Sequence, residues 1–255
     1  MGAESKETFC LVIRSQDHGE SDRILTLFSH DHGRCTAIAK GANKSQKRFV
    51  NKLEIFSFLK IYYKEPRPGA LFFLEEAELH NSFLPLRRSY LNYCCGSVIL
   101  EAILAGIPEH EPDSNLFSLM LWALHTIEKS KDPRKPVTLF LIRFFNLLGY
   151  RPHFSCCTSC GTETQSSSEF SFDPDTGGLL CQSCSGLTEY NKNRISHGTI
   201  RLIEDSSDKP LQQLERTGIS LLQIQEVTKI FLEYGRQLFQ KELSSWKLFN
   251  QLSGL

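Results

Sequence analysis

Two cysteine pairs with C-x2-C spacing lie in the second half of the chain, Cys157 with Cys160 and Cys181 with Cys184. Residues 161–180 separate them. A tight turn with this spacing can present two thiolates to one tetrahedral metal ion, and two such turns complete a four-thiolate zinc site. Because the protein would fill all four ligand positions, we expect a structural Zn2+ without an open position for a substrate or an activated water.

The nine cysteines also allow other interpretations, namely two disulfides or four buried thiols without a metal. The chain begins with MGAESKET, which is not an apolar signal segment. We therefore expect a reducing cytoplasm, where disulfides are disfavoured and metal binding is favoured. Cys156 directly precedes Cys157 and is the reserve ligand, although its spacing to Cys160 would be C-x3-C.

A second candidate site is the basic segment from Arg34 to Lys64. It holds eight basic residues against one acidic residue, a net charge of +7, although the whole chain is neutral. Residues 40–48 combine cations with small hydrogen-bonding residues, which suits a phosphate backbone. A solvated charged loop is the alternative interpretation. The candidate DNA-binding residues are Lys40, Lys44, Lys47, Arg48, Lys52, Phe56, Lys60 and Tyr62.

These residues lie in a region whose pattern predicts short strands. The expected strands are rich in β-branched and aromatic residues and cover residues 9–13, 24–28, 34–39, 53–64 and 71–79. Turn signals separate them, the last at residues 66–69. Five short strands in about eighty residues are typical of a small closed barrel such as the OB-fold, a common oligonucleotide binder.

Alternation in the expected fourth strand assigns its side chains to two faces. Leu59, Ile61 and Tyr63 share one face with Leu53 and Ile55, which we assign to the core. The other face interleaves aromatic residues and lysines: Phe56, Phe58, Lys60, Tyr62 and Lys64. Such a face could stack unpaired bases. The alternative is that Phe56 and Phe58 pack beneath a neighbouring helix.

After residue 79 the apolar period becomes helical. Expected helices cover residues 82–106, 116–129 with Asp113 or Ser114 as N-cap, 137–148, and one or two within 219–252. The third is apolar on nearly every side and should be central to the helical core. We therefore predict an α+β fold: an OB-fold at 1–80 and a helical domain at 81–255, with a zinc ribbon inserted at about 152–190.

Several function classes lack their signatures. The chain has no phosphate-binding G-x-x-x-x-G-K-[ST] loop, no G-x-G-x-x-G after a strand, no H-E-x-x-H and no G-x-S-x-G. The longest nearly apolar stretch, residues 94–107, is too short to span a bilayer and contains Glu101. We expect neither an enzyme, a small-molecule substrate nor a membrane association.

The order of several short motifs resembles the RecO family of bacterial DNA-repair proteins. The motifs are GESDRILTLFS at 19–29, KGA at 40–42, EEAEL at 75–79, Arg143 with LLGYRP at 147–152, the Cys157/Cys160 pair, and FDP at 172–174 before Gly177 and Gly178. The resemblance extends over most of the chain.

The resemblance implies an N-terminal OB-fold, a helical domain and a zinc-ribbon-like insertion. It also implies binding of single- and double-stranded DNA and annealing of complementary strands. The implied partners are RecR and the C-terminal tail of single-stranded-DNA-binding protein (SSB), in helping RecA assemble on coated DNA. It assigns Lys40, Lys44, Lys47 and Arg48 to DNA contact, in a cytoplasmic, nucleoid-associated protein. Arg134, Lys135 or Arg143 would suit an acidic peptide with an apolar end.

Two alternatives stay open from the residues themselves. OB-folds and zinc ribbons also serve RNA, so an RNA-binding protein is one alternative. The other is a non-enzymatic interaction scaffold that presents its zinc ribbon as a surface. It predicts no nucleic-acid affinity at physiological salt.

Overall fold

The computed structural model describes residues 5–65, 71–164, 170–185, 193–241 and 243–253. The predicted turn at 66–69 lies outside these residues. The chain divides into two compact units, one of Met1–Tyr90 and Ile107–Leu121, the other of Leu91–Gly106 and Trp122–Leu255. No helix within the described ranges is long and apolar enough to cross a membrane.

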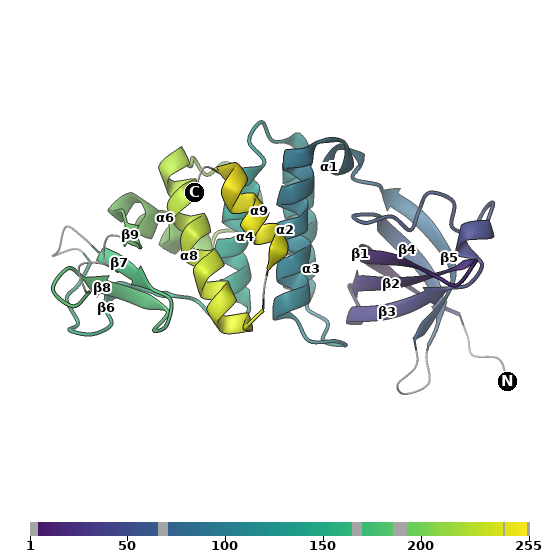
Figure 1. Ribbon diagram of the computed structural model, residues 1–255, viewed down its shortest axis with the longest axis horizontal. Coiled ribbons are helices and arrows are strands. Elements are labelled where there is room, and N and C mark those ends of the chain that lie inside the picture. The colour runs from purple at the N-terminus through teal and green to yellow at the C-terminus, as the bar shows by residue number, and fades with distance from the viewer. Residues whose placement is uncertain (1–4, 66–70, 165–169, 186–192, 242, 254–255) are drawn as a thin grey trace. The chain divides into compact units, whose positions relative to one another are not determined.

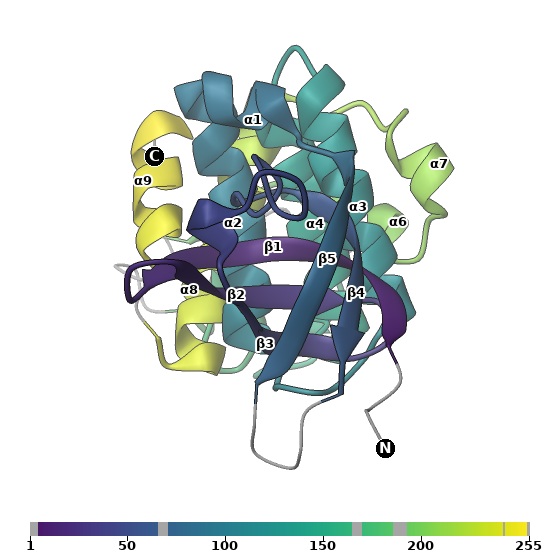
Figure 2. The same ribbon diagram turned by 90° about the vertical axis from the view of Figure 1, so that its right-hand side faces the viewer.

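The first unit is a closed five-stranded barrel (Figures 1 and 2), which confirms the predicted small β-barrel. Its order around the barrel is β1-β2-β3-β5-β4. The strands are β1 (Lys6–His18), β2 (Asp22–Ser29), β3 (Gly33–Ala39), β4 (Phe58–Lys64) and β5 (Phe72–Asn81). All neighbours are antiparallel except β3 and β5, which pair in parallel only at Ala37–Phe72 and Ile38–Phe73.

The inside of the barrel is filled mainly by small and branched apolar side chains, together with the rings of Phe49, Tyr63 and Phe72. In β4 the predicted alternation is confirmed, because Leu59, Ile61 and Tyr63 are buried while the residues between them are partly exposed. The predicted fourth strand nevertheless starts too early. Residues 49–56 form turns, with positive φ at Asn51 and Phe56, so pairing begins only at Phe58.

Helices form most of the second unit, although the first of them and the start of the third belong to the first unit. They are α1 (Leu84–Arg88), α2 (Tyr90–Gly106), α3 (Ser114–Lys129), α4 (Arg134–Leu147), α6 (His197–Ser207), α7 (Leu211–Leu214), α8 (Leu221–Phe239) and α9 (Ser244–Ser253). The helix predicted for 82–106 is two helices, since Ser89 is extended. Asp113 caps α3 as predicted, because its carboxylate accepts the backbone N–H groups of Asn115 and Leu116 at 2.8 and 2.9 Å.

Helix α4 is the centre of the helical core, as its apolar surface predicted. It is buried along most of its length and packs against α6 and α8. Its two polar exceptions have structural partners: Arg143 and Asn146 both donate to the Ser207 carbonyl at the end of α6, Asn146 at 2.8 Å. These side chains supply hydrogen-bond donors to a carbonyl at the helix end that has no partner within the helix.

A second, four-stranded sheet lies in the chain between α4 and α6, where an insertion was predicted (Figure 1). Its strands are β6 (His153–Cys157), β7 (Phe170–Asp173), β8 (Gly178–Cys181) and β9 (Arg194–Ile195), in the order β6-β8-β7-β9. We call this segment the ribbon. In the ribbon, the ring of Phe172 contacts the ring of Tyr234 in α8, so the sheet packs against this helix.

Candidate metal centre and nucleic-acid interface

The four paired cysteines sit at two adjacent strand ends. Cys157 ends β6 and Cys181 ends β8, and these strands are parallel neighbours. After each of these strands the chain turns back sharply. The Gly161 N–H donates to the Cys157 carbonyl at 2.9 Å, and the Cys184 N–H donates to the Cys181 carbonyl at 3.0 Å. Gly161 has φ +76°, which a side chain would strain. Neighbouring strands thereby bring both C-x2-C turns to one place.

The sulfurs of Cys157, Cys160, Cys181 and Cys184 all lie within 4.8 Å of one another. Those of Cys160 and Cys181 are 3.6 Å apart. In a tetrahedral zinc–thiolate site the Zn–S bonds of about 2.3 Å place sulfurs about 3.8 Å apart. The cluster therefore fits a single tetrahedral metal ion, with four thiol ligands and no protein position left open.

Local hydrogen bonds favour thiolates in this cluster. The Thr162 hydroxyl, 3.1 Å from the Cys160 sulfur, is the main cause that lowers the pKa of Cys160 to about 6. Cys184 differs: a hydrogen bond with Ser159 favours its thiolate, but its interactions with the sulfurs of Cys160 and Cys181 outweigh this and raise its pKa to about 12. The Cys160 thiolate is thus favoured at neutral pH, whereas a bound cation would be needed to displace the proton of Cys184.

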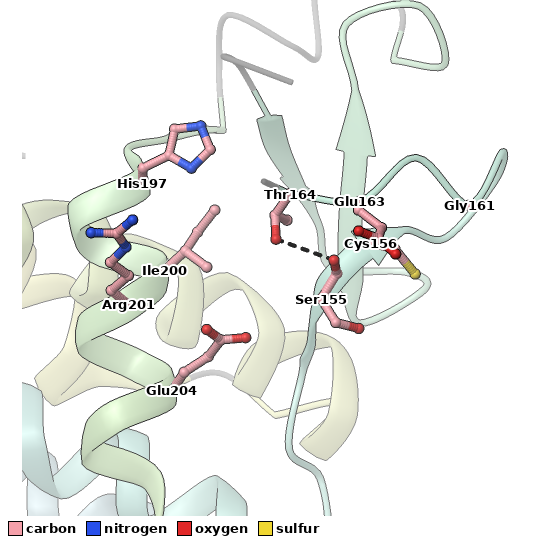
Figure 3. A pocket seen from close by; sticks show the side chains of 9 residues that line it. All are labelled: Ser155, Cys156, Gly161, Glu163, Thr164, His197, Ile200, Arg201 and Glu204. Carbon is pink, nitrogen blue, oxygen red and sulfur yellow. Dashed lines mark hydrogen bonds between the residues drawn. The ribbon is translucent and has the colours of Figure 1, made fainter. Parts of the chain in front are cut away.

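Cys156 is not part of the cluster, although its place in the sequence made it the reserve ligand. Successive residues of a strand point to opposite faces, so Cys156 and Cys157 cannot both face the other three cysteines. Figure 3 shows Cys156 instead beside Ser155 and Glu163, in the lining of a cavity next to α6. The remaining cysteines, Cys10, Cys35, Cys94 and Cys95, are buried and do not form disulfides.

Hydrogen bonds join the motif at residues 19–29 to the segment that starts with the motif at residues 40–42. The Asp22 carboxylate accepts the Gly41 backbone N–H at 2.8 Å, and the Asn43 N–H donates to the Ser21 carbonyl at 2.9 Å. Gly41 has φ +68°, so the chain can turn there without strain. The β1–β2 turn therefore fixes the start of residues 40–48, which we call the basic loop.

The basic loop carries four exposed cations, Lys40, Lys44, Lys47 and Arg48. Among the described residues, none of the three lysines forms an ion pair with a carboxylate. Arg48 contacts the carbonyls of Glu75 and Lys40, both at 3.3 Å, and its guanidinium lies 4.9 Å from the Phe49 ring. Four positive charges are thus presented without a compensating acid in the loop.

Lys52, also expected to contact DNA, is bound to the protein's own backbone. Its ammonium donates to three backbone carbonyls, those of Lys47 and Arg48 at 3.1 Å and Ala77 at 2.7 Å. An ammonium has three donors, so all are used inside the protein. The structure therefore gives Lys52 a structural role, the closing of the loop against β5, while its DNA contact stays a prediction.

The expected aromatic platform on β4 is also not formed as predicted. Phe56 is 0% exposed and lies in a turn before the strand, so it offers no ring to a base. Lys60 and Tyr62 do face outward, but both are bonded to acidic side chains. Lys60 pairs with Glu7 at 2.9 Å, and the Tyr62 hydroxyl donates to Glu78 at 3.1 Å. The sequence of β4 alone could not reveal these partners.

In the helical unit the three suggested cations separate. Arg134 is held by Asp132 through two bonds of 2.8 Å, and Arg143 caps α6. Lys135 donates to the Glu215 carbonyl at 3.3 Å and borders a hollow next to Lys129 and Leu139. A second hollow shares Glu215 with the first and is lined by Trp122 and Arg216.

Trp122 was not singled out by the sequence. Its indole nitrogen is buried without a hydrogen-bond partner in the described part of the chain. A buried indole N–H normally finds an acceptor, so this donor is an unsatisfied polar group inside the helical unit. The only sequence signal was that Trp122 directly precedes Ala123, which belongs to the apolar stripe of α3.

Comparison with known proteins gives one consistent family. The family model described as Recombination protein O N terminal matches residues 4–83, and the one described as Recombination protein O C terminal matches residues 87–247. The "DNA repair protein RecO" of Syntrophobacter fumaroxidans is 32% identical over 253 residues, covering 97% of this chain and 98% of that protein.

Two further relatives carry the same description. That of Desulfitobacterium hafniense is 30% identical over 95% of this chain and 88% of its own length. That of Syntrophus aciditrophicus is 28% identical over 94% of this chain and 93% of its own length. With both family models matched in order and a relative aligned over nearly the full length, the chain belongs to the RecO family.

Proposed function

We propose that this protein is a recombination mediator in DNA repair. It binds single- and double-stranded DNA, anneals complementary strands and, together with RecR, helps RecA load onto SSB-coated single-stranded DNA. The observation that carries the proposal is the basic loop, whose four cations are exposed and free of carboxylate partners within the described chain. Its membership in the RecO family supports the same activity, acting on chromosomal DNA in the cytoplasm.

The basic loop explains annealing without a catalytic residue. Lys40, Lys44 and Lys47 neutralise phosphates and release the counterions that those phosphates hold. Two strands bound near the same cations repel one another less, so complementary sequences meet more often. Because phosphate contacts carry no sequence information, the preference for particular sequences should be slight.

Zn2+ is the metal that the cysteine cluster fits best. Four thiolates in a tetrahedral set favour zinc or an iron–sulfur centre, and a single-ion sulfur spacing favours zinc. The ion would supply only cross-linking. Cys157 and Cys181 would join the ends of β6 and β8, while Cys160 and Cys184 close the two turns.

The hollows around Glu215 are the proposed site for the SSB tail. Lys129, Lys135 and Arg216 can meet acidic residues, and Leu139 and the Trp122 ring can hold an apolar end. An anisotropy titration with an acidic peptide that ends in phenylalanine tests this. Lys135→Ala and Trp122→Phe should each weaken binding, whereas Arg201→Ala on α6 should not. Equal affinity for all variants would contradict the assignment.

The first experiment is a fluorescence-anisotropy titration of single-stranded DNA, duplex DNA and matched RNA at two salt concentrations. Submicromolar DNA binding that weakens steeply with salt, together with faster annealing of complementary oligonucleotides, is the expected result. A clear preference for RNA would favour the RNA-binding alternative. No binding of any nucleic acid at low salt would refute the proposed activity.

A further inference from the structure

The outer face of β1, β4 and β5 carries a regular pattern of side chains. Strand register places Phe9, Lys60 and Glu78 in one cross-strand row. The next row consists of Glu7, Tyr62 and Glu76. We call these six residues the acidic face; β4 and β5 lie on the side of the barrel that Figure 2 turns to the viewer.

The acidic face has more negative than positive charge. Three carboxylates surround one ammonium, so its net charge is −2. Lys60 compensates Glu7 at 2.9 Å, and the Tyr62 hydroxyl donates to Glu78 at 3.1 Å. Glu76 is exposed and has no ion-pair partner among the residues that the structure describes. A phosphate backbone would be repelled here, in contrast to the basic loop of the same barrel.

Aromatic rings border these carboxylates. Phe9 is 40% exposed, and its ring lies 5.7 Å from Phe58 and 5.1 Å from His80. The Phe58 and His80 rings are themselves 5.7 Å apart. The three rings form an apolar surface at one end of the acidic face. A large exposed apolar group beside uncompensated acids is typical of a site that another molecule covers.

From this charge and ring pattern we infer that the acidic face docks an arginine-bearing segment of a partner protein. A guanidinium can lie flat on an aromatic ring while its N–H groups pair with a carboxylate. The Lys60 ammonium already lies 5.5 Å from the Tyr62 ring and pairs with Glu7. The position open to an added guanidinium is therefore the ring cluster of Phe9, Phe58 and His80, which shares the outer face with Glu78 and Glu76. Lysine gains less from this surface, because it has no planar group to stack. The inference does not depend on the proposed DNA activity.

The test uses a fluorescein-labelled twelve-residue peptide with three arginines spaced by serine and leucine, and its lysine counterpart. The full-length protein should bind the arginine peptide several-fold more tightly. The double variant E76Q/E78Q should weaken arginine-peptide binding about tenfold, since it removes the two carboxylates that Lys60 does not pair with. The matched variant E204Q/D205N, which removes two exposed acids of α6, should leave binding unchanged.

A second variant, Phe9→Ser, separates stacking from charge: it should reduce the preference for arginine over lysine while the charge stays the same. The melting temperature serves as the folding control, because E76Q/E78Q changes only exposed side chains and should leave it close to that of the wild type. Equal binding by E76Q/E78Q and wild type, or equal affinity for both peptides, would overturn the inference. The inference would also be overturned if single-stranded DNA competed with the peptide and Phe9→Ser lost DNA binding, since the same face would then bind DNA.

Discussion

The ribbon and the basic segment of the barrel contrast in how sequence becomes structure. In the ribbon, the four paired cysteines meet in one cluster. In the barrel, the expected DNA-binding residues separate. Four stay on the exposed basic loop, Lys52 closes that loop, Phe56 is buried, and Lys60 and Tyr62 join an acidic face. A C-x2-C turn determines its own geometry, whereas the meaning of a lysine depends on neighbours from other strands.

The largest expected effect is the loss of the metal centre. Cys181→Ser removes one of four ligands and should abolish stoichiometric zinc, measured by elemental analysis. Loss of a structural metal costs several kcal/mol, and about 2–4 °C of Tm follows each kcal/mol in a unit of this size, so Tm should fall by roughly 10 °C. Cys156→Ser is the matched control and should retain both metal and Tm. A wild-type protein purified without any bound metal would contradict the assignment.

Next in size is the effect of emptying the basic loop. The triple variant K44A/K47A/R48A removes three phosphate partners, which should weaken single-stranded DNA binding about 10- to 100-fold and reduce the salt slope by about 2. Since Arg48 also contacts the β5 edge, the double variant K44A/K47A is the cleaner control for charge alone. Unchanged affinity in both variants would remove the basic loop as the DNA site.

Lys52→Met should affect stability more than binding. The substitution leaves three carbonyls without their ammonium donor, and a charge-assisted hydrogen bond contributes about 1.5–3 kcal/mol. We expect a loss of about 2 kcal/mol in the free energy of unfolding by urea. DNA affinity below the unfolding transition should change little. A variant with wild-type stability and much weaker DNA binding would restore Lys52 as a DNA contact.

The smallest effect is expected for Lys60→Ala on the acidic face. Lys60 is paired with Glu7 at the surface, and such pairs contribute about 0–1 kcal/mol. DNA affinity should therefore change by less than about twofold at 0.1 M salt. A tenfold loss of affinity would show that the β4 face does contact DNA and would remove the contrast with the basic loop.

The features that could be predicted are those set by local sequence. Strand alternation identified the inward residues of β4, Asp113 was an identifiable cap, and the apolar surface of α4 predicted its central position. What could not be predicted depended on register or on turns. Glu7 and Glu78 reach Lys60 and Tyr62 only because of how three strands pair. The positive φ of Phe56, which ends the regular alternation, has no signature in a non-glycine residue.

The open edge of β5 gives the basic loop a second significance. Beyond Phe73 the strand has no further described neighbour on the β3 side, and its Glu75 and Ala77 carbonyls are met by Arg48 and Lys52. Unpaired edges invite pairing with another chain, and charged side chains discourage it. Arg48 and Lys52 therefore cover this edge of β5 directly beside the cations that we propose for DNA contact. Arg48 should tolerate change less readily than Lys44, which is exposed and forms no ion pair among the described residues.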